Sequence, residues 1–376
     1  MRLIPDQDER DLAAMCRDLL AAECPPTLAR TLHEPNGGRV TPDLWRALAG
    51  AGVLGLAIEE PLGGSGGGLS ELGVFSVEAG RALCPTVVHS TLCAARAIDW
   101  LGGPEARAAW LPALASGGAR GCTALWSPRD ASDLTPRLLA EPQPRGGWRL
   151  SGTADFVADA DLADIIVVTA QAAGATLGFV IDVCAPCVSV QPVSMMGGHR
   201  AFAVEFDGVH VAEPERILFH TNGIPVPPLR RVANGAVALA SLDLVGVGEA
   251  VLQRTVDHTK MREQFGRPIA SFQAAQHLVA DMRISLSAAR LAGHSAAFWI
   301  GKGRIGTREA AIARMHAAEV KRITLDAHQL HGGMGYVLDT DLHLFSERAR
   351  VLATLGGGAD TAAKWLEAEM TGQGCE

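Results

Sequence analysis

Apolar residues recur at three- to four-residue intervals through the first third of the chain, which is the spacing of one helix face. Residues 10–22 show this spacing, and it returns at 70–83. Thr41 and Pro42 mark a further helix start, because threonine caps helices and proline suits their first turn. The glycine-rich stretch 61–68 lacks the Gly-Lys-Ser/Thr ending of a phosphate-binding loop and is interpreted as a flexible connection.

The pattern changes after about residue 120, where short runs rich in β-branched and aromatic residues replace helical spacing. Such runs are typical of strands, especially when they alternate sides or are followed by glycine. They occupy residues 148–152, 165–169, 177–183 and 201–206. The proline-rich stretch 222–228 that follows is typical of a linker.

Helical spacing resumes beyond this linker in segments rich in alanine and leucine. The segments are 232–264, 271–300, 308–330 and 360–370. Four helices of this size can pack as a bundle. We therefore predict an α+β multidomain protein: an N-terminal α-helical domain (1–120), a middle β-domain (121–225) and a C-terminal four-helix bundle (226–376).

Composition narrows the range of partners and compartments. The 376 residues are 48% apolar and carry a net charge of −8 without a long basic run, so neither nucleic acid nor membrane is an expected partner. The apolar stretch 232–251 is interrupted by Asn234, Asp243 and Glu249, which predicts a buried core helix. Charges in residues 1–10 and eight cysteines without a disulfide framework indicate a cytoplasmic protein.

Two motifs carry the candidate chemistry. The first spans residues 261–273 and contains an arginine that can bond a pyrophosphate, a phenyl ring that can pack on adenine and amides that can read polar edges. Its candidate cofactor-binding residues are Arg262, Gln264, Phe265, Phe272 and Gln273.

The second motif, 328–336, contains Gln329 followed by Gly332 and Gly333. The two glycines can end a helix, and they can also let the backbone approach phosphate groups. Both roles are compatible, so all three residues are candidates for cofactor binding. His328 and His331 have no carboxylate partner in the pattern and are interpreted as structural.

Together the two motifs resemble the FAD-binding signature of the acyl-CoA dehydrogenase family, and the order of helical, β and helical regions extends the resemblance over nearly the whole chain. The resemblance implies an oxidoreductase that desaturates acyl-CoA thioesters with FAD. It also implies that the residues of both motifs reach the FAD of a neighbouring subunit.

The family's flavin-ring segments are altered in this chain. The Thr-Glu-Pro-x-x-Gly-Ser-Asp segment corresponds to residues 126–133, where Trp126 replaces the flavin-bonding threonine and Ser132, near the acyl chain, is kept. The family's Trp-Ile-Thr corresponds to Phe156, Val157 and Ala158, which removes a second hydroxyl.

The catalytic base is also missing at both places where the family carries it. The Glu-Gly-Thr turn reads Gly356-Gly357-Gly358, and the alternative position on the bundle helix is Ala236. Asp243, Glu249 and Asp360 lie nearby in sequence and are interpreted as capping or solvated carboxylates. No catalytic residue is therefore identified.

Three hypotheses remain open. In the first, the chain is the base-lacking partner subunit of a heterotetramer, as in family members that act on steroid side-chain CoA thioesters. In the second, it is a tailoring enzyme with altered flavin-dependent or non-redox chemistry. In the third, it is a non-catalytic acyl-CoA-binding or structural homo-oligomer. No metal site is expected, because Cys184 and Cys187 lack two further ligands at suitable spacing.

Overall fold

A computed structural model describes residues 5–34, 38–196, 199–218 and 223–372. The N-terminal region is helical, as predicted. Its elements are α1 (Gln7–Glu23), α2 (Pro26–His33), α3 (Pro42–Gly50), the short 3₁₀ helix η1 (Glu60–Leu62), α4 (Leu69–Arg81), α5 (Thr86–Leu101) and α6 (Pro104–Ala115). The helix starting at Pro42 is confirmed, with Thr41 as its N-cap residue.

The glycine-rich stretch 61–68 is an ordered turn rather than the flexible connection predicted. Ser65, Gly66 and Gly67 donate backbone hydrogen bonds to carbonyls of the preceding loop at 2.8–3.0 Å. A Cβ atom on Gly64 would lie 2.0 Å from the Ile58 carbonyl oxygen, so only glycine fits there. The glycines serve close backbone packing, which sequence spacing alone did not reveal.

The middle region is a seven-stranded sheet. Its strands are β1 (Gly121–Ala124), β2 (Leu138–Pro142), β3 (Trp148–Ala158), β4 (Ile165–Ala172), β5 (Ala175–Asp182), β6 (Val188–Val193) and β7 (Ala201–Val211), and η2 (Pro214–Arg216) follows. The order is β1-β4-β2-β3-β7-β6, with β5 on the other side of β4. A register shift between Ala154 and Val157 places Phe156 in a bulge with φ of +55°.

The C-terminal region is built on one long helix, α7 (Val226–Met261). The elements after it are β8 (Glu263–Gln264), β9 (Arg267–Pro268), η3 (Ile269–Ser271), α8 (Gln273–Gly301), α9 (Thr307–Ala317), α10 (Val320–His331), η4 (Gly332–Tyr336), η5 (Leu338–Thr340), α11 (Leu342–Leu352) and α12 (Ala359–Met370). The helical architecture is confirmed, but the segment predicted as one helix over 308–330 is divided into α9 and α10.

Both ends of α7 differ from the prediction. Pro227 and Pro228 lie in its first turn, where their missing N–H groups cost nothing, so the predicted linker is wrong from Val226 onward. At the other end the helix stops at Met261, and residues 263–268 form a hairpin instead of the predicted last helical turn. Phe265 and Gly266 turn this hairpin with φ of +54° and +77°.

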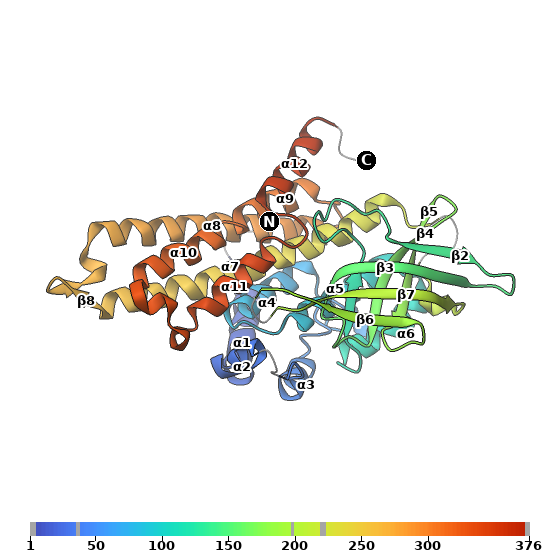
Figure 1. The fold of residues 1–376 in the computed structure, drawn as a ribbon, viewed down its shortest axis with the longest axis horizontal. Coiled ribbons are helices and arrows are strands. Elements are labelled where there is room, and N and C mark those ends of the chain that lie inside the picture. The colour runs from blue at the N-terminus through green and yellow to red at the C-terminus, as the bar shows by residue number, and fades with distance from the viewer. Residues whose placement is uncertain (1–4, 35–37, 197–198, 219–222, 373–376) are drawn as a thin grey trace.

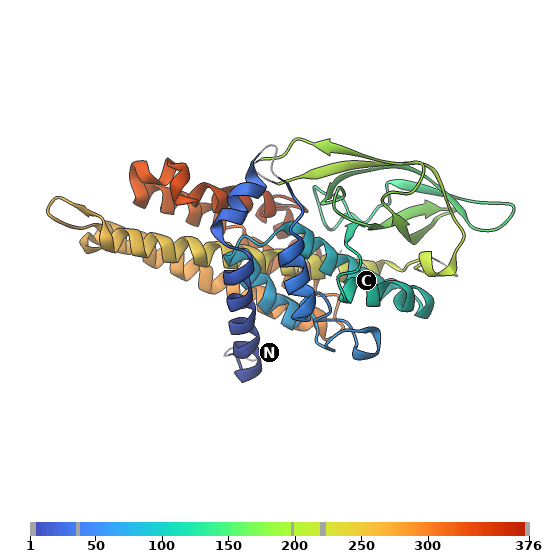
Figure 2. The same ribbon diagram turned by 90° about the horizontal axis from the view of Figure 1, so that it is seen from below.

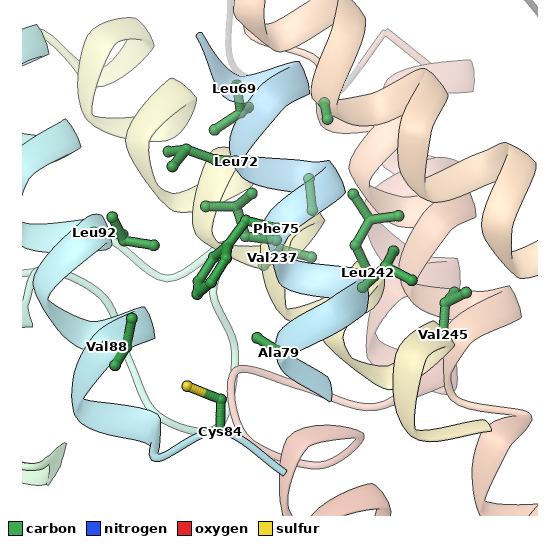
Figure 3. Close-up of a cluster of buried hydrophobic side chains, with 14 of the residues drawn as sticks. Leu69, Leu72, Phe75, Ala79, Cys84, Val88, Leu92, Val237, Leu242 and Val245 are labelled. Atoms are coloured by element: carbon green, nitrogen blue, oxygen red, sulfur yellow. The ribbon is translucent and has the colours of Figure 1, made fainter. Parts of the chain in front are cut away.

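The core joins the N- and C-terminal helices. A Cβ atom on Gly246 of α7 would lie 1.9 Å from the Val77 carbonyl oxygen of α4, so glycine allows the two backbones to touch. Figure 3 shows Phe75 of α4 among side chains of α5 and α7. By length and composition α7 could cross a membrane, but 83% of its most apolar window is buried, which agrees with the predicted core helix.

The long axis of the molecule separates the sheet from the hairpin. In Figure 1 and in the perpendicular view of Figure 2, the β8–β9 hairpin lies at one end and the seven-stranded sheet lies at the other. With a helix rise of ~1.5 Å per residue, Ala236 and Met261 are about 38 Å apart along α7.

Candidate functional site

A cavity of about 460 Å³ lies where the sheet meets the helices. It is lined by residues of α5, β3, α7 and α11 and by the loops after β1 and α11. Among its lining residues are five positions that the sequence singled out: Trp126, Phe156, Ala158, Ala236 and Gly356. The fold therefore brings together the altered flavin-ring segments and both vacant base positions. Ser132 lies in the same loop as Trp126 but outside the lining of the cavity.

Backbone hydrogen bonds join the two altered loops directly. The Gly356 N–H donates to the Pro128 carbonyl at 2.7 Å, and the Ala131 N–H donates to the Gly356 carbonyl at 2.8 Å. Arg314 of α9 holds the same turn by donating to the carbonyl oxygens of Leu355 and Gly357. Burial lowers the pKa of Arg314 to about 10. The turn that lacks the base is thus firmly positioned beside the cavity.

Positions 126 and 158 offer no side-chain hydroxyl to a flavin ring. Trp126 is partly buried and packs against the core, and Ala158 ends β3. Phe156 presents a phenyl ring from the bulge and is 37% exposed. The cavity keeps other polar groups, among them the hydroxyls of Ser127 and Thr169. The cavity therefore has both apolar and polar groups for an organic ligand. It lacks the two hydroxyls, at positions 126 and 158, that the family resemblance assigns to the flavin ring.

The nearby carboxylates are engaged in ion pairs or lie at a helix end. Asp243 is buried and bonded by Arg348, with Nε to Oδ1 at 2.9 Å. Glu249 pairs with Arg81 and Arg290. Both differ from the capping or solvated carboxylates that were predicted, because each is the centre of an ion pair. Asp360 is exposed in the first turn of α12, as predicted.

Two chemically active side chains in this cavity were not identified from the sequence. His89 and Cys93 of α5 both line it, and His89 Nε2 lies 3.4 Å from Cys93 Sγ. Their i, i+4 spacing puts them on one face of a helix. That spacing is the signal in the sequence, but it carries meaning only once residues 86–101 are known to be helical.

The candidate cofactor-binding residues of the first motif lie on and beside the hairpin. Arg262, Gln264 and Gln273 are exposed, and the Phe265 side chain is 92% exposed. Phe272 is half-buried and lies under the Arg267 guanidinium, whose carbon is 4.1 Å from the ring centre. An exposed cation can bond a pyrophosphate, an exposed aromatic ring can pack on adenine, and exposed amides can bond polar edges of the base.

The residues of the second motif lie at the same end of the molecule as the hairpin. His331 at the end of α10 stacks on His258 of α7, with ring centres 4.3 Å apart. Gln329, Gly332 and Gly333 are exposed there, and Gly332 is the C-cap of α10 with φ of +58°. His328 is buried between the Gly335 carbonyl and the Ser346 hydroxyl, at 2.7 Å from each, which agrees with a structural role.

We define the residues of the two motifs as the nucleotide arm: Arg262, Gln264, Phe265, Phe272, Gln273, Gln329, Gly332 and Gly333. The cavity is lined by residues 236–243 in the first half of α7, whereas the hairpin of the nucleotide arm follows the last residue of that helix. Ala236 and Met261 are about 38 Å apart along the helix. The two groups of residues are therefore widely separated within one chain.

Comparison with known proteins identifies the family of the chain. Residues 6–118 match the acyl-CoA dehydrogenase N-terminal domain, and residues 230–369 match the C-terminal domain. The chain is 30% identical over 370 residues to the acyl-CoA dehydrogenase IpdE2 of Mycobacterium tuberculosis, covering 98% of this chain and 99% of that protein.

Solved structures show the same similarity. The ChsE4-ChsE5 complex from Mycobacterium tuberculosis has a TM-score of 0.89 and 27% identity, with 99% of each chain covered. A steroid ACAD, the Tcur3481-Tcur3483 variant, has a TM-score of 0.87 and 29% identity, with 98% of each chain covered. From these matches over its whole length, the chain belongs to the acyl-CoA dehydrogenase family.

Proposed function

We propose that this chain is a partner subunit that completes the FAD site of a homologous neighbouring subunit, in an assembly that desaturates an acyl-CoA thioester. The observation that carries the proposal is the position of the nucleotide arm. Most of its residues are exposed on or near the β8–β9 hairpin, at the opposite end of the molecule from the sheet (Figure 1), where a neighbouring subunit can contact them.

Family membership confirms the prediction of an FAD-dependent oxidoreductase class. Bound FAD would supply the acceptor for the hydride of the acyl β-carbon. On this chain, Arg262 would bond the pyrophosphate, and the exposed ring of Phe265 would pack on the adenine. The amides of Gln273 and Gln329 would bond polar edges of the nucleotide, and Gly332 and Gly333 would allow close backbone approach.

The state of the chain's own cavity supports a partner role. Neither Gly356 nor Ala236 provides a carboxylate, and the carboxylate of Asp243 is bonded by Arg348. A positioned general base contributes ~10²–10⁴-fold to rate, so the lack of a carboxylate at both family positions favours another subunit as the supplier of the desaturating site. The similarity to ChsE4-ChsE5, which is a complex of two named subunits, favours a heterotetramer with a homologous acyl-CoA dehydrogenase over a homo-oligomer.

The proposed substrate is an acyl-CoA thioester of lipid or steroid metabolism, since one structural relative is a steroid ACAD. The proposed compartment is the cytoplasm. The substrate class is inferred from the structural relative and the compartment from composition. The partner role is inferred from the position of the nucleotide arm.

The test is an alanine substitution at Arg262 in the complex with the partner subunit. A charge-assisted pair of hydrogen bonds is worth ~1.5–3 kcal/mol, so Arg262→Ala should weaken FAD binding by roughly 10–100-fold. Titration of the FAD-depleted complex with FAD, followed by flavin fluorescence, measures this.

The matched control is Arg46→Ala, which removes an exposed arginine that pairs with Asp43 on the surface of α3. The control complex should bind FAD as the wild type does. Unchanged FAD affinity and activity in the Arg262→Ala complex would contradict the proposed function.

A further inference from the structure

One face of α5 presents a row of polar side chains to the cavity. Thr86, His89, Ser90 and Cys93 all line it, and their spacing of i, i+3, i+4 and i+7 is that of one helix face. Thr86 and Ser90 donate hydrogen bonds to the buried carboxylate of Asp159, at 2.9 and 2.8 Å. His89 and Cys93 instead contact each other, at 3.4 Å between Nε2 and Sγ.

Cys93 lies beside one of the vacant base positions. Cys93 and Ala236 both line the main cavity, and both also line a separate space of about 10 Å³ between α5 and α7. Cys93 is 6% exposed, and it is one of the residues that line the cavity. A thiol next to position 236 can approach the same substrate atoms that a carboxylate on residue 236 would approach.

The charges around the pair favour the protonated form of His89. Burial by itself lowers the pKa of His89, but the charge and hydrogen bond of Cys93 outweigh it, with help from Asp243 and against Arg348. The net result raises the pKa of His89 to about 9. An imidazole in contact with a cysteine is the pairing that activates thiol groups in enzymes, either as a positive neighbour or as the acceptor of the thiol proton.

We propose that Cys93, in contact with His89 and beside position 236, is a general base that removes a proton from the carbon next to the carbonyl of an acyl thioester bound in this cavity. The thiolate sulfur takes the proton, and the electron pair of the C–H bond remains on the substrate as an enolate delocalised onto the thioester carbonyl. The thiol then returns a proton to the carbon or releases it to solvent. The step consumes no oxidant, so it proceeds with or without flavin.

This inference depends on the proposed function only for the acyl-CoA thioester as ligand of the cavity. It goes beyond that function, because it gives the chain's own cavity a catalytic group. Cys93 is the catalytic residue, and His89 is a positioning residue that acts through the thiol. Attack of the same thiolate on the thioester carbonyl would be a different activity, and the experiment separates the two.

The experiment measures exchange of the α-proton for deuterium. The purified full chain is incubated in deuterated buffer with butyryl-CoA, octanoyl-CoA or a CoA thioester of a steroid side-chain acid, and mass spectrometry follows deuterium in the acyl group. The wild type should exchange at least one of these probes above the buffer blank. Cys93→Ala should reduce the rate by at least ~100-fold.

Three further variants make the result specific. Cys122→Ala, at a buried cysteine of β1 outside the cavity lining, should exchange as the wild type does. His89→Gln should move the pH at which exchange is half-maximal upward, because the thiolate loses its positive neighbour. Adding Ala236→Glu to Cys93→Ala should restore exchange, since it places a carboxylate in the same part of the cavity.

Exchange at the wild-type rate in Cys93→Ala, or exchange by none of the three probes, would overturn the proposal. An acyl adduct on Cys93 in the intact-mass spectrum would also overturn it, by identifying a nucleophile. No flavin or partner subunit takes part in the assay. Its failure is therefore distinct from a failure of the Arg262→Ala test, which measures FAD binding by the complex.

Discussion

Arg348 of α11 holds the carboxylate of Asp243 of α7 through two parallel hydrogen bonds, from Nε to Oδ1 and from Nη2 to Oδ2. The side chains are only 6% and 4% exposed. Arg348 also donates to the Cys84 carbonyl at 2.6 Å, which connects α7 and α11 to the loop between α4 and α5. Burial alone would lower the pKa of Arg348, but Asp243 outweighs it and raises the pKa. The pair explains why Asp243 cannot replace the missing base.

Breaking this pair should destabilise the fold. Arg348→Met leaves the Asp243 carboxylate buried without a counter-charge, which typically costs ~3–5 kcal/mol. Chemical denaturation of the purified chain measures the loss. Replacing both partners, as in Asp243→Leu with Arg348→Met, should recover most of it, because neither charge is then left alone. A loss below about 1 kcal/mol in the single variant would show that the pair is not a stability determinant.

A side chain at position 356 should destabilise the glycine turn because of the backbone conformation there. Gly356 has φ of +74°, and a Cβ atom there would meet only the Ala131 Cβ at an ordinary 3.5 Å. Gly356→Ala should therefore cost ~1–2 kcal/mol through the left-handed backbone alone. Gly50→Ala, at the end of α3 with no atom within 4 Å of the new Cβ, should be neutral or stabilising. Equal melting temperatures for the two variants would contradict this reading of the turn.

Acid should destabilise the protein through His294 of α8. Burial and the Arg290 charge lower the pKa of His294 to about 4 from an ordinary value near 6.5. The His294 ring therefore binds a proton more strongly in the unfolded chain than in the folded one. Its contribution to the free energy of unfolding is present above pH 6.5 and is lost as pH falls toward 4. The loss from this group approaches about 3 kcal/mol at most.

Melting temperatures measured between pH 7 and pH 4 test the contribution of His294. The His294→Gln variant lacks the titrating ring, so its melting temperature should fall less over this interval than that of the wild type. Parallel declines in the two proteins would assign the acid sensitivity to other groups.

The sequence predicted the region order, and it located the candidate residues of the nucleotide arm in two short motifs, because both depend on local signals. The arm residues follow one another in two short motifs, and the hairpin needs only Phe265-Gly266 to turn. The break between α9 and α10 was missed because it falls at Ala318 and Glu319, both good helix formers. The prolines at 227 and 228 were read as a linker because proline suits both linkers and helix starts.

The bounds of α5 inside the predicted helical region were not predicted. Most of its residues are buried on all sides of the helix, so apolar residues do not mark a single buried face in the sequence. His89 and Cys93 therefore could not be paired from the sequence. The ion pair of Asp243 with Arg348 was missed for a related reason, since 105 positions separate the partners and only packing brings them together.

The central claim is that this chain completes a neighbour's FAD site while its own flavin-ring residues are altered. The visible absorption spectrum of the purified protein, alone and after co-expression with a homologous acyl-CoA dehydrogenase subunit that has an intact Glu-Gly-Thr turn, tests it most directly. The expected result is a colourless chain that becomes yellow with its partner, at one FAD per pair of subunits. A flavin band from the chain alone would contradict it.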